Sequence, residues 1–327
     1  MAMFPVFSSI LAPEAIAQFV RTEYHLQIIN CQFWHRGLSD VYLLESSNSS
    51  YIFRIYHHHW RNREDIGFEL EFLTYLRKNK IPVSEPLISI NREVCLSLQA
   101  PEGTRYGALF DFAAGAIALG DVNTQQSYLL GTTIAKLHQC SLDFHSSYFR
   151  EPLDLKFILD NALVHISPFL AKREKELQEL HEIVKFLQEQ ISQLSQQPPY
   201  WTTCWGDPHS GNIHFEGNHS LTLFDFDQCG YGYRLFDIAK FWQVAIQSGL
   251  SRNIRDEFLR GYQRGESLSS IEISLLNSFT QIAHIWSWSI SLNTAKLYDY
   301  CRLDDHYFSR RIQHLKRLSS KDFYPRL

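Results

Sequence analysis

The chain has 327 residues, of which 45% are hydrophobic and 20% charged, and its formal net charge is −4 at pH 7. These values exclude a disordered chain, which would combine low hydrophobicity with high net charge, and they allow two domains or lobes with substantial cores. The acidic balance offers no basic footprint for nucleic acid, so we expect no nucleic-acid partner.

The cysteines and the apolar runs bear on where the protein works. The six cysteines are scattered without a Cys-x-x-Cys pair, which gives no sign of a disulfide scaffold or a zinc site. No Lys or Arg precedes Arg21, and no apolar run approaches the ~20 residues needed to span a bilayer. We therefore expect a cytoplasmic protein that does not enter a membrane.

The first third of the chain predicts two helices and five strands. Residues 13–24 and 65–78 have the apolar spacing of amphipathic helices. The segments between and after them alternate or run apolar, as strands do, before the chain reaches Ala113-Ala114-Gly115. The expected strands cover residues 26–33, 41–44, 51–56, 94–98 and 106–112.

Three consecutive histidines, His57, His58 and His59, invite a metal hypothesis. Successive side chains of an extended segment point to alternate sides, so three adjacent imidazoles cannot converge on one ion. We interpret the run as a solvated exit from the preceding strand.

Beyond Gly115 the pattern is mainly helical. Residues 124–139 predict a helix, and 174–193 carry apolar residues at alternating spacings of three and four, which make a narrow seam. Such a seam fits a coiled-coil dimer or packing inside the second lobe. The short run, ended by Pro198-Pro199, favours packing, and the oligomeric state stays open.

The segment from 203 to 227 carries the chemistry. Asp207 lies five residues before Asn212, and Asp225 follows on a later apolar run. Phosphoryl transfer asks little covalent work of a protein; it needs an acceptor hydroxyl held in line and Mg²⁺ on the phosphate oxygens. Asp207 would accept the hydroxyl proton or orient the hydroxyl, and Asn212 and Asp225 would offer oxygen ligands to Mg²⁺. The pattern therefore predicts a kinase.

Two further features of this segment support that interpretation. Gly206 and Gly211 bracket the loop, where a missing Cβ lets the chain turn sharply and approach a ligand. Residues 221–226 read as a buried strand, and a carboxylate in such a strand needs a charged partner or a metal. Asp225 is therefore expected to be a ligand.

The chain resembles the aminoglycoside phosphotransferase and choline kinase-like superfamily in three motifs: GDPHSGN at 206–212, FDFD at 224–227 and DIA at 237–239. The resemblance is strong in this part of the chain and weak in the N-terminal part. It implies an α+β, bilobal protein-kinase-like fold. A β-rich lobe over residues 1–112 would bind nucleotide, and a mainly helical lobe over 113–327 would hold the catalytic and substrate-binding residues.

The resemblance also implies a role for each motif residue. Asp207 would be the catalytic base, Asn212 and Asp225 would be Mg²⁺ ligands, and ATP would be the phosphoryl donor. Asp237, in the DIA element, is usually structural in the superfamily. Members commonly carry His directly before the Gly-Asp pair, whereas this chain has Trp205. We expect the chemistry to survive this change and the packing of the loop to differ.

In the first lobe the resemblance implies nucleotide contacts. Gly37 and Ser39 would cover the phosphates, although a plain hairpin turn fits as well, because this loop has a single glycine. Arg54 takes the strand position of a phosphate-binding lysine, and the alternative is an edge-strand arginine that faces solvent. Glu69 would pair with Arg54, and Glu71 is the fallback.

The segment that leaves the first lobe would form a hinge. Main-chain amides from Phe110 to Phe112 would bond to adenine in a kinase-like fold. A simple linker between lobes fits the same residues, and the two interpretations are compatible.

The acceptor is expected to be a small hydroxyl compound, such as an amino-alcohol, an amino sugar or an aminoglycoside-like molecule. Aromatic rings and carboxylates in the C-terminal third suit a cationic substrate, although the spacing of the tryptophans also fits a buried helix. Two alternatives remain: a Ser/Thr protein kinase of the same superfamily, and a nucleotide-binding regulator with impaired catalysis. The aromatic and acidic residues are Trp242, Trp286, Trp288, Tyr298, Tyr300, Asp299, Asp304 and Asp305.

Overall fold

The structure of the chain is a computed structural model, which describes residues 4–118 and 122–320. This part of the chain divides into two compact units. The first unit ends at Ala114 and also takes in residues 145–150 and 222–224. The second unit begins at Gly115 and holds the rest of the described chain.

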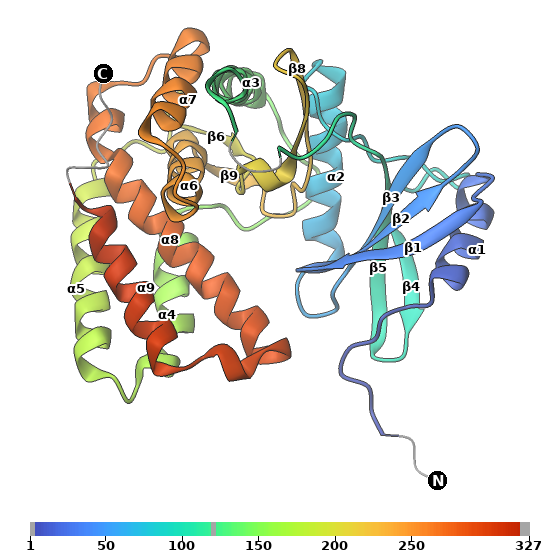
Figure 1. Ribbon diagram of the computed structural model, residues 1–327, viewed down its shortest axis with the longest axis horizontal. Coiled ribbons are helices and arrows are strands. Elements are labelled where there is room, and N and C mark those ends of the chain that lie inside the picture. Colours follow the sequence, from blue (N-terminus) through green and yellow to red (C-terminus); the bar gives the residue numbers. More distant parts are fainter. Residues whose placement is uncertain (1–3, 119–121, 321–327) are drawn as a thin grey trace. The chain divides into compact units, whose positions relative to one another are not determined.

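A five-stranded antiparallel sheet forms the body of the first unit (Figure 1). The strands lie in the order β1-β2-β3-β5-β4, so β3 is internal, with β2 on one side and β5 on the other. The five strands are β1 (Asn30–Arg36), β2 (Ser39–Glu45), β3 (Ser50–Tyr56), β4 (Leu96–Ala100) and β5 (Gly103–Asp111).

Two helices, α1 (Pro13–Tyr24) and α2 (Arg63–Lys78), cover this sheet. Side chains alternate along β3, and its residues Phe53 and Ile55 share a core cluster with the buried face of α1. Arg54, between them, points the other way and reaches α2. The two helices therefore pack on opposite faces of the sheet.

Local chemistry sets where these helices begin. Pro13 suits the first helical position, because its φ is already helical and it has no N–H to satisfy. Before α2, the Asn62 side chain accepts the Asp65 amide while Asp65 accepts the Asn62 amide, which makes a capping box. The helix predicted over 13–24 is confirmed at both ends.

The first strand is shifted from its predicted place at 26–33. β1 is an edge strand with mostly exposed side chains, so it has little apolar alternation that sequence reasoning could detect. Its register is set by pairing with β2, where Arg36 lies opposite Asp40, and by an irregularity between Phe33 and His35. The other four strands overlap their predicted ranges.

The second unit is mainly helical. In this part of the chain β6 pairs with β9, and the loop after β6 leads to β7, which pairs with β8, a strand whose last two residues are counted with the first unit. The strands are β6 (Trp201–Cys204), β7 (Ile213–Glu216), β8 (Ser220–Leu223) and β9 (Gly230–Tyr233). The helices are α3 (Thr124–Ser141), α4 (Asn161–Ile166), α5 (Glu174–Ile191), α6 (Arg234–Gln247), α7 (Arg252–Gly265), α8 (Ser270–Tyr298) and α9 (Asp305–Leu318).

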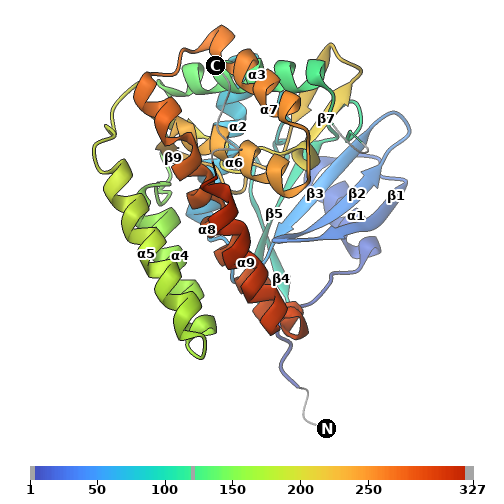
Figure 2. The ribbon, with the colours of Figure 1, turned by 60° about the vertical axis from the view of Figure 1, so that its left-hand side comes forward.

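Helices α4, α5, α8 and α9 pack together (Figure 2). The seam expected over 174–193 is the buried face of α5, formed by Leu180, Val184, Leu187 and Ile191. This face is used for packing inside the unit, as the sequence favoured, and not for a coiled-coil dimer.

The tryptophans of the C-terminal third belong to the core. Trp242 on α6 and Trp286 and Trp288 on α8 are all buried, which confirms the core interpretation. Tyr298, the last residue of α8, and Tyr300, just beyond it, are exposed. Among the helices that the structure describes, none is both long enough and apolar enough to cross a membrane.

Candidate active site

The loop between β6 and β7 carries Asp207 and Asn212. Gly206 opens the loop with a φ of +88°, a conformation that L side chains rarely adopt. A Cβ at this position would lie 2.1 Å from the Gln228 carbonyl oxygen, so only glycine fits. The loop ends in a short 3₁₀ turn, Ser210–Asn212, from which β7 continues.

Asp237, in the first turn of α6, fixes the start of this loop. Its carboxylate accepts the main-chain amides of Trp205 and Gly206, each at 2.8 Å. It also accepts a hydrogen bond from His138 Nε2 at 2.9 Å, and His138 Nδ1 pairs with the Tyr262 hydroxyl at 2.9 Å. Asp237 is fully buried, so these bonds form in a dry interior where they hold the loop firmly.

The same cluster contains three potential metal ligands. Ligand atoms of His138, Cys204 and Asp237 lie within 4.8 Å of one another. Each is already engaged, because Cys204 Sγ donates to the Tyr233 carbonyl at 3.3 Å and the other two bond to each other. Burial raises the pKa of the Cys204 thiol well above its usual range, which disfavours the thiolate that a metal would bind. The cluster is a hydrogen-bonded brace.

Trp205 stands where the superfamily commonly has His. Its side chain is fully buried and stacks on Phe226, with ring centroids 5.2 Å apart. Its Nε1 donates to the main-chain oxygen of Asp225 at 3.0 Å. Trp205 therefore joins the Asp207 loop to the segment that carries Asp225.

Asp225 lies beyond a strand and not inside one. β8 ends at Leu223, and Asp225 has a φ of 60°, in the left-handed region that residues other than glycine rarely occupy. The prediction of a strand over 221–226 is therefore wrong at its C-terminal end, because the chain turns at Asp225. A rare conformation that a neighbouring side chain holds in place is frequent at functional sites.

Asp207 is contacted on both carboxylate oxygens. Lys240 Nζ lies 3.1 Å from Oδ1. On the other oxygen, Gln228 Nε2 donates at 3.0 Å, Asn212 Nδ2 lies 3.5 Å away, and His209 Nε2 lies 3.6 Å away. The Asp207 side chain keeps 16% exposure, so it is not sealed from solvent.

These neighbours set the charge of Asp207. Burial raises the pKa of its carboxyl, but Lys240 and His209 outweigh burial and hold that pKa well below its usual range. Asp207 is therefore an anion at neutral pH and can accept a hydrogen bond from a hydroxyl.

Asn212 is oriented by the same loop. Its Nδ2 donates to the main-chain oxygen of Asp207 at 3.1 Å, and the residue is buried. Because the amide nitrogen is used in this way, the amide oxygen is the atom that can bind a cation.

Sequence reasoning did not single out Lys240 or Gln228. Lys240 lies three residues after Asp237 on α6, on the same face of a helix that is otherwise largely apolar and buried. A lysine in such a helix needs a counter-ion, so its place in the sequence could have indicated a buried ion pair. Gln228 carried no comparable signal, since a glutamine after a turn is usually solvated.

Arg54 of the first unit is buried on the internal strand β3. Its Nη1 donates to Glu69 Oε1 at 2.8 Å, and the Tyr56 hydroxyl donates to the other oxygen of Glu69 at 2.8 Å. The guanidinium also lies over the Phe110 ring, 5.6 Å from its centroid. The predicted pairing with Glu69 is present, and a solvated edge-strand arginine is excluded.

Glu71, the fallback partner, points elsewhere. Its carboxylate accepts hydrogen bonds from the Ser146 hydroxyl and from the Ser147 amide, the latter at 2.9 Å. Both serines belong to the 145–150 segment, so Glu71 fixes that segment on the first unit.

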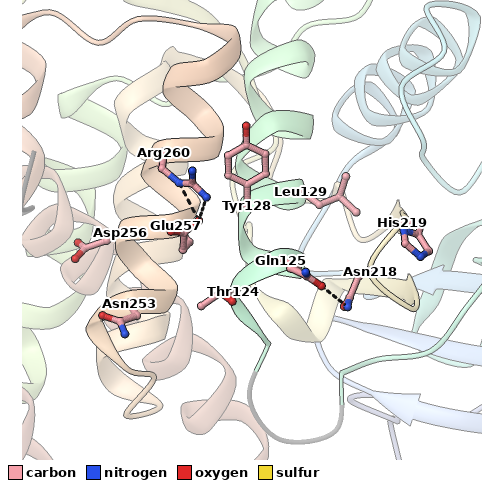
Figure 3. Close-up of a pocket in the computed structure, with 10 residues that line it drawn as sticks. All are labelled: Thr124, Gln125, Tyr128, Leu129, Asn218, His219, Asn253, Asp256, Glu257 and Arg260. Atoms are coloured by element: carbon pink, nitrogen blue, oxygen red, sulfur yellow. Dashed lines mark hydrogen bonds and ion pairs between the residues drawn. The ribbon is translucent and has the colours of Figure 1, made fainter.

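The second unit also has a pocket of about 700 Å³ where the start of α3, the β7–β8 turn and α7 meet (Figure 3). Its side chains largely bond to one another: Arg260 pairs with Glu257 at 2.6 Å, and Asn218 donates to Gln125. Asp207, Asn212 and Asp225 are not among its lining residues. The lining is Thr124, Gln125, Tyr128, Leu129, Asn218, His219, Asn253, Asp256, Glu257 and Arg260.

The model of the phosphotransferase enzyme family, APH, matches residues 31–270, which is most of the chain. The chain belongs to this phosphotransferase enzyme family. The resemblance indicated by the GDPHSGN, FDFD and DIA motifs is thereby confirmed, and so is the activity class of a phosphotransferase.

One relative in sequence and two solved structures are similar to most of the chain. The uncharacterized protein sll1119 of Synechocystis sp. is 48% identical over 321 residues, which cover 98% of this chain and 89% of that protein. The solved structure of the amicoumacin kinase hAmiN, in complex with AMP-PNP, Ca²⁺ and Ami, has a TM-score of 0.78 at 20% identity and covers 93% of this chain and 92% of its own. A microcompartment-associated aminopropanol kinase has a TM-score of 0.76 at 16% identity and covers 93% and 95%. These structures confirm the kinase-like α+β fold.

In this phosphotransferase the turn between β1 and β2 is tight. The Gly37 amide donates to the Ser39 carbonyl at 3.0 Å, so it is used inside the turn. Behind the turn, Asp40 is fully buried and accepts from Arg36 Nε and Arg105 Nη2, each at 2.8 Å. These bonds describe a hairpin turn, and a role of Gly37 and Ser39 in covering phosphates stays a prediction.

The expected hinge amides are engaged within the first unit. The Phe112 amide donates to the Ser50 carbonyl at 3.2 Å, and the Asp111 amide donates to the Glu85 carbonyl at 3.0 Å. Phe110 lies in β5 opposite Ile52. Recognition of adenine from Phe110 to Phe112 therefore stays a prediction, and these two amides would have to leave their present partners.

The three histidines diverge, as the sequence indicated. His57 Nε2 pairs with Asp40 at 3.2 Å, His58 Nδ1 lies 3.0 Å from the Thr104 carbonyl, and His59 stacks on Phe7. The expectation that the run is solvated is wrong for His57, which is buried, because Asp40 on the neighbouring strand β2 supplies its partner.

Proposed function

We propose that the protein transfers the γ-phosphate of ATP, with Mg²⁺, to a hydroxyl group of a small molecule. One observation carries the proposal: the carboxylate of Asp207 is kept ionised by Lys240, is still partly exposed, and lies beside Asn212, whose amide oxygen is suited to bind a cation. Family membership supplies the class of reaction, and these residues supply the chemistry.

Asp207 would align the acceptor hydroxyl by accepting a hydrogen bond from it. A carboxylate with a low pKa is a weak base, so its first contribution is to hold the hydroxyl oxygen in line with the phosphorus. The hydroxyl becomes strongly acidic as its oxygen bonds to phosphorus, and the proton can then pass to Asp207 late in the reaction.

The oxygen atoms of Asn212 and Asp225 fit Mg²⁺, which prefers hard oxygen ligands. Asn212 is oriented through its bond to the Asp207 main chain, and Asp225 through the indole of Trp205. Bound there, Mg²⁺ would neutralise phosphate oxygens of the nucleotide. The AMP-PNP and Ca²⁺ of the hAmiN complex support a nucleotide and a divalent ion in a protein of this fold.

The first unit is proposed to bind the nucleotide, with Arg54 on its phosphates. Glu69 and Tyr56 hold the guanidinium in place, and the five N–H donors of a guanidinium in a planar fork suit phosphate oxygens. Gly37 and Ser39 are proposed to lie near the phosphates, and Phe110 and Phe112 near the base.

The acceptor is proposed to be an amino-alcohol, an amino sugar or an aminoglycoside-like compound. This class is supported by the names of two structures of similar fold, an amicoumacin kinase and an aminopropanol kinase. The alternative acceptor is a Ser or Thr hydroxyl of a protein, which would make the chain a Ser/Thr protein kinase. The presence of Asp207 and Asn212 on a loop braced by Asp237, together with Asp225 after β8, argues against a regulator with impaired catalysis.

The test is phosphotransfer by the purified chain from radiolabelled ATP, with and without Mg²⁺. The acceptors are pooled amino-alcohols, amino sugars and aminoglycosides, and a generic protein substrate is run separately. The proposal expects label in a small molecule, only with Mg²⁺ and only with Asp207 present. Label that appears only in protein would replace this acceptor class by the protein-kinase alternative.

A further inference from the structure

Two side chains that hold Asp207 are themselves held by neighbouring residues of α8. Gln228 Oε1 accepts the indole N–H of Trp286 at 3.1 Å, and Lys240 Nζ donates to Ser287 Oγ. Trp286 and Ser287 are consecutive in the middle of α8. Each oxygen of Asp207 is thus connected, through one intermediary, to the same turn of one helix.

Each of these links has a fixed direction. An indole N–H can only donate, so Trp286 selects Oε1 of Gln228 and turns its Nε2 toward Asp207. Ser287 donates its own proton to the Ala283 carbonyl at 2.8 Å, so its oxygen is the acceptor for Lys240. Neither link can reverse, because an indole N–H and an ammonium group can only donate.

The side chains that form these links are buried. Burying polar and charged groups costs folding free energy, so we expect the arrangement to serve a function. Counted over the whole residue, Lys240, Gln228 and Trp286 are 5%, 8% and 6% exposed. A buried ion pair adds little to stability compared with well-packed apolar residues of similar size. What such a pair can provide is a defined position for one charged group, here the carboxylate of Asp207.

We propose that Lys240 and Gln228 are positioning residues that clamp the plane of the Asp207 carboxylate, and that α8 anchors this clamp through Ser287 and Trp286. The inference rests on the proposed function, which gives Asp207 its part in aligning the acceptor hydroxyl. A carboxylate held by donors on both oxygens cannot rotate freely about its last torsion, so its lone pairs stay aimed at one place.

Four substitutions each remove one link and keep most of the side-chain volume: K240M, Q228L, W286F and S287A. Two controls on α8 match W286F and S287A. W288F makes the same change at a fully buried tryptophan whose Nε1 has no hydrogen-bond partner among the described residues. S291A removes a hydroxyl that donates to the Ser287 carbonyl of its own helix, at 2.8 Å.

Loss of the clamp should lower kcat and leave KM for Mg-ATP unchanged. For K240M and Q228L the expected fall in kcat is on the order of 100-fold, the effect of misplacing a reacting group by about 1 Å. W286F and S287A, which loosen the clamp by one hydrogen bond, should lower kcat about fivefold. W288F and S291A should keep the wild-type kcat.

Two further variants separate positioning from a general loss of structure. K240R keeps the cation and should recover part of the lost kcat. K240A leaves room for a small amine, so added methylamine or ethylamine should raise its kcat and should not affect K240M, whose side chain fills the space. A wild-type kcat in K240M, or a W286F variant no slower than W288F, would overturn the clamp and leave the proposed function standing.

A stability measurement tests the clamp without activity. Thermal unfolding of K240M, D207N and the double variant gives the coupling between the two side chains. The clamp requires that their effects be clearly non-additive, and additive effects would overturn it. If the wild-type chain neither binds Mg-ATP nor transfers phosphate, the proposed function falls, and this coupling alone decides whether the clamp exists.

Discussion

Two buried ion pairs underlie the proposed chemistry, and they are built with opposite polarity. In the first unit Arg54 pairs with Glu69 at 2.8 Å, and the carboxylate is the more buried partner, 1% exposed against 11% for the cation. In the second unit Lys240 pairs with Asp207 at 3.1 Å, and the cation is the more buried partner, 7% exposed against 16%.

In each pair the more exposed group is the one to which the proposed function gives a ligand: phosphate for Arg54 and an acceptor hydroxyl for Asp207. The buried partner has a different task, since it supplies a counter-charge that fixes the exposed group in place. Removing the exposed group should therefore abolish chemistry or binding, and removing the anchor should misplace what remains.

The largest effect is expected at the exposed end of the second pair. D207N keeps the size of the side chain but removes the anion that aligns the acceptor hydroxyl, so kcat should fall by about 10³-fold or more. The measurement is acceptor-dependent release of ADP, with D143N, an exposed Asp after α3, as control. A D207N enzyme as fast as D143N would show that Asp207 takes no part in the reaction.

The first pair should respond differently, because its anchor is a buried carboxylate. R54M leaves Glu69 buried without its cation and should lower the free energy of unfolding by about 3–5 kcal/mol. R54M/E69Q removes both charges and should recover much of that stability while Mg-ATP binding stays weak. Unfolding curves and calorimetry on the same samples check both parts, and normal Mg-ATP binding by the double variant would remove Arg54 from the nucleotide site.

A smaller effect concerns the side of α8 that faces Lys240 and α9. Burial, with Arg311 and His314, lowers the pKa of His284 well below its ordinary 6.5, and Lys240 adds to this. The folded state then binds fewer protons than the unfolded state, so stability is complete above pH 6.5 and is lost as the pH falls toward the folded pKa.

H284L should therefore lose less stability than the wild type between about pH 7 and pH 5, a range that brackets the ordinary His pKa. Unfolding midpoints across this range measure the difference, with the exposed His165 changed in H165L as control. The same acid-side loss in H284L, H165L and the wild type would mean that the buried histidine does not titrate with folding.

Sequence reasoning reached the residues whose signal is local. Asp207, Asn212 and Asp225 could be proposed from the sequence because their spacing within one loop and the next is itself the signal, and their roles stay a prediction. The helix over 13–24 could be predicted because its apolar period is regular. The partners of Asp207 come from α6 and from beyond β8, and they become neighbours only when the second unit folds. For that reason Lys240 and Gln228 escaped notice.

The same limit explains the errors in the first unit. β1 is an exposed edge strand, so its place depends on pairing with β2 and not on its own pattern. His57 can be buried because Asp40 on the adjacent strand pairs with it, and no spacing along the chain indicates that contact. What a segment's own chemistry determines could be predicted, and what a distant partner determines could not.

The proposed function gives Asp207 the acceptor hydroxyl and Asp225 the metal, and calorimetric titration with Mg-ATP tests this division of roles most directly. D207N should bind Mg-ATP as tightly as the wild type, because Asp207 acts on the acceptor hydroxyl. D225N should lose most of the Mg²⁺-dependent affinity, because Asp225 is proposed to hold the metal. Equal loss of Mg-ATP affinity in D207N and D225N would contradict this division of roles.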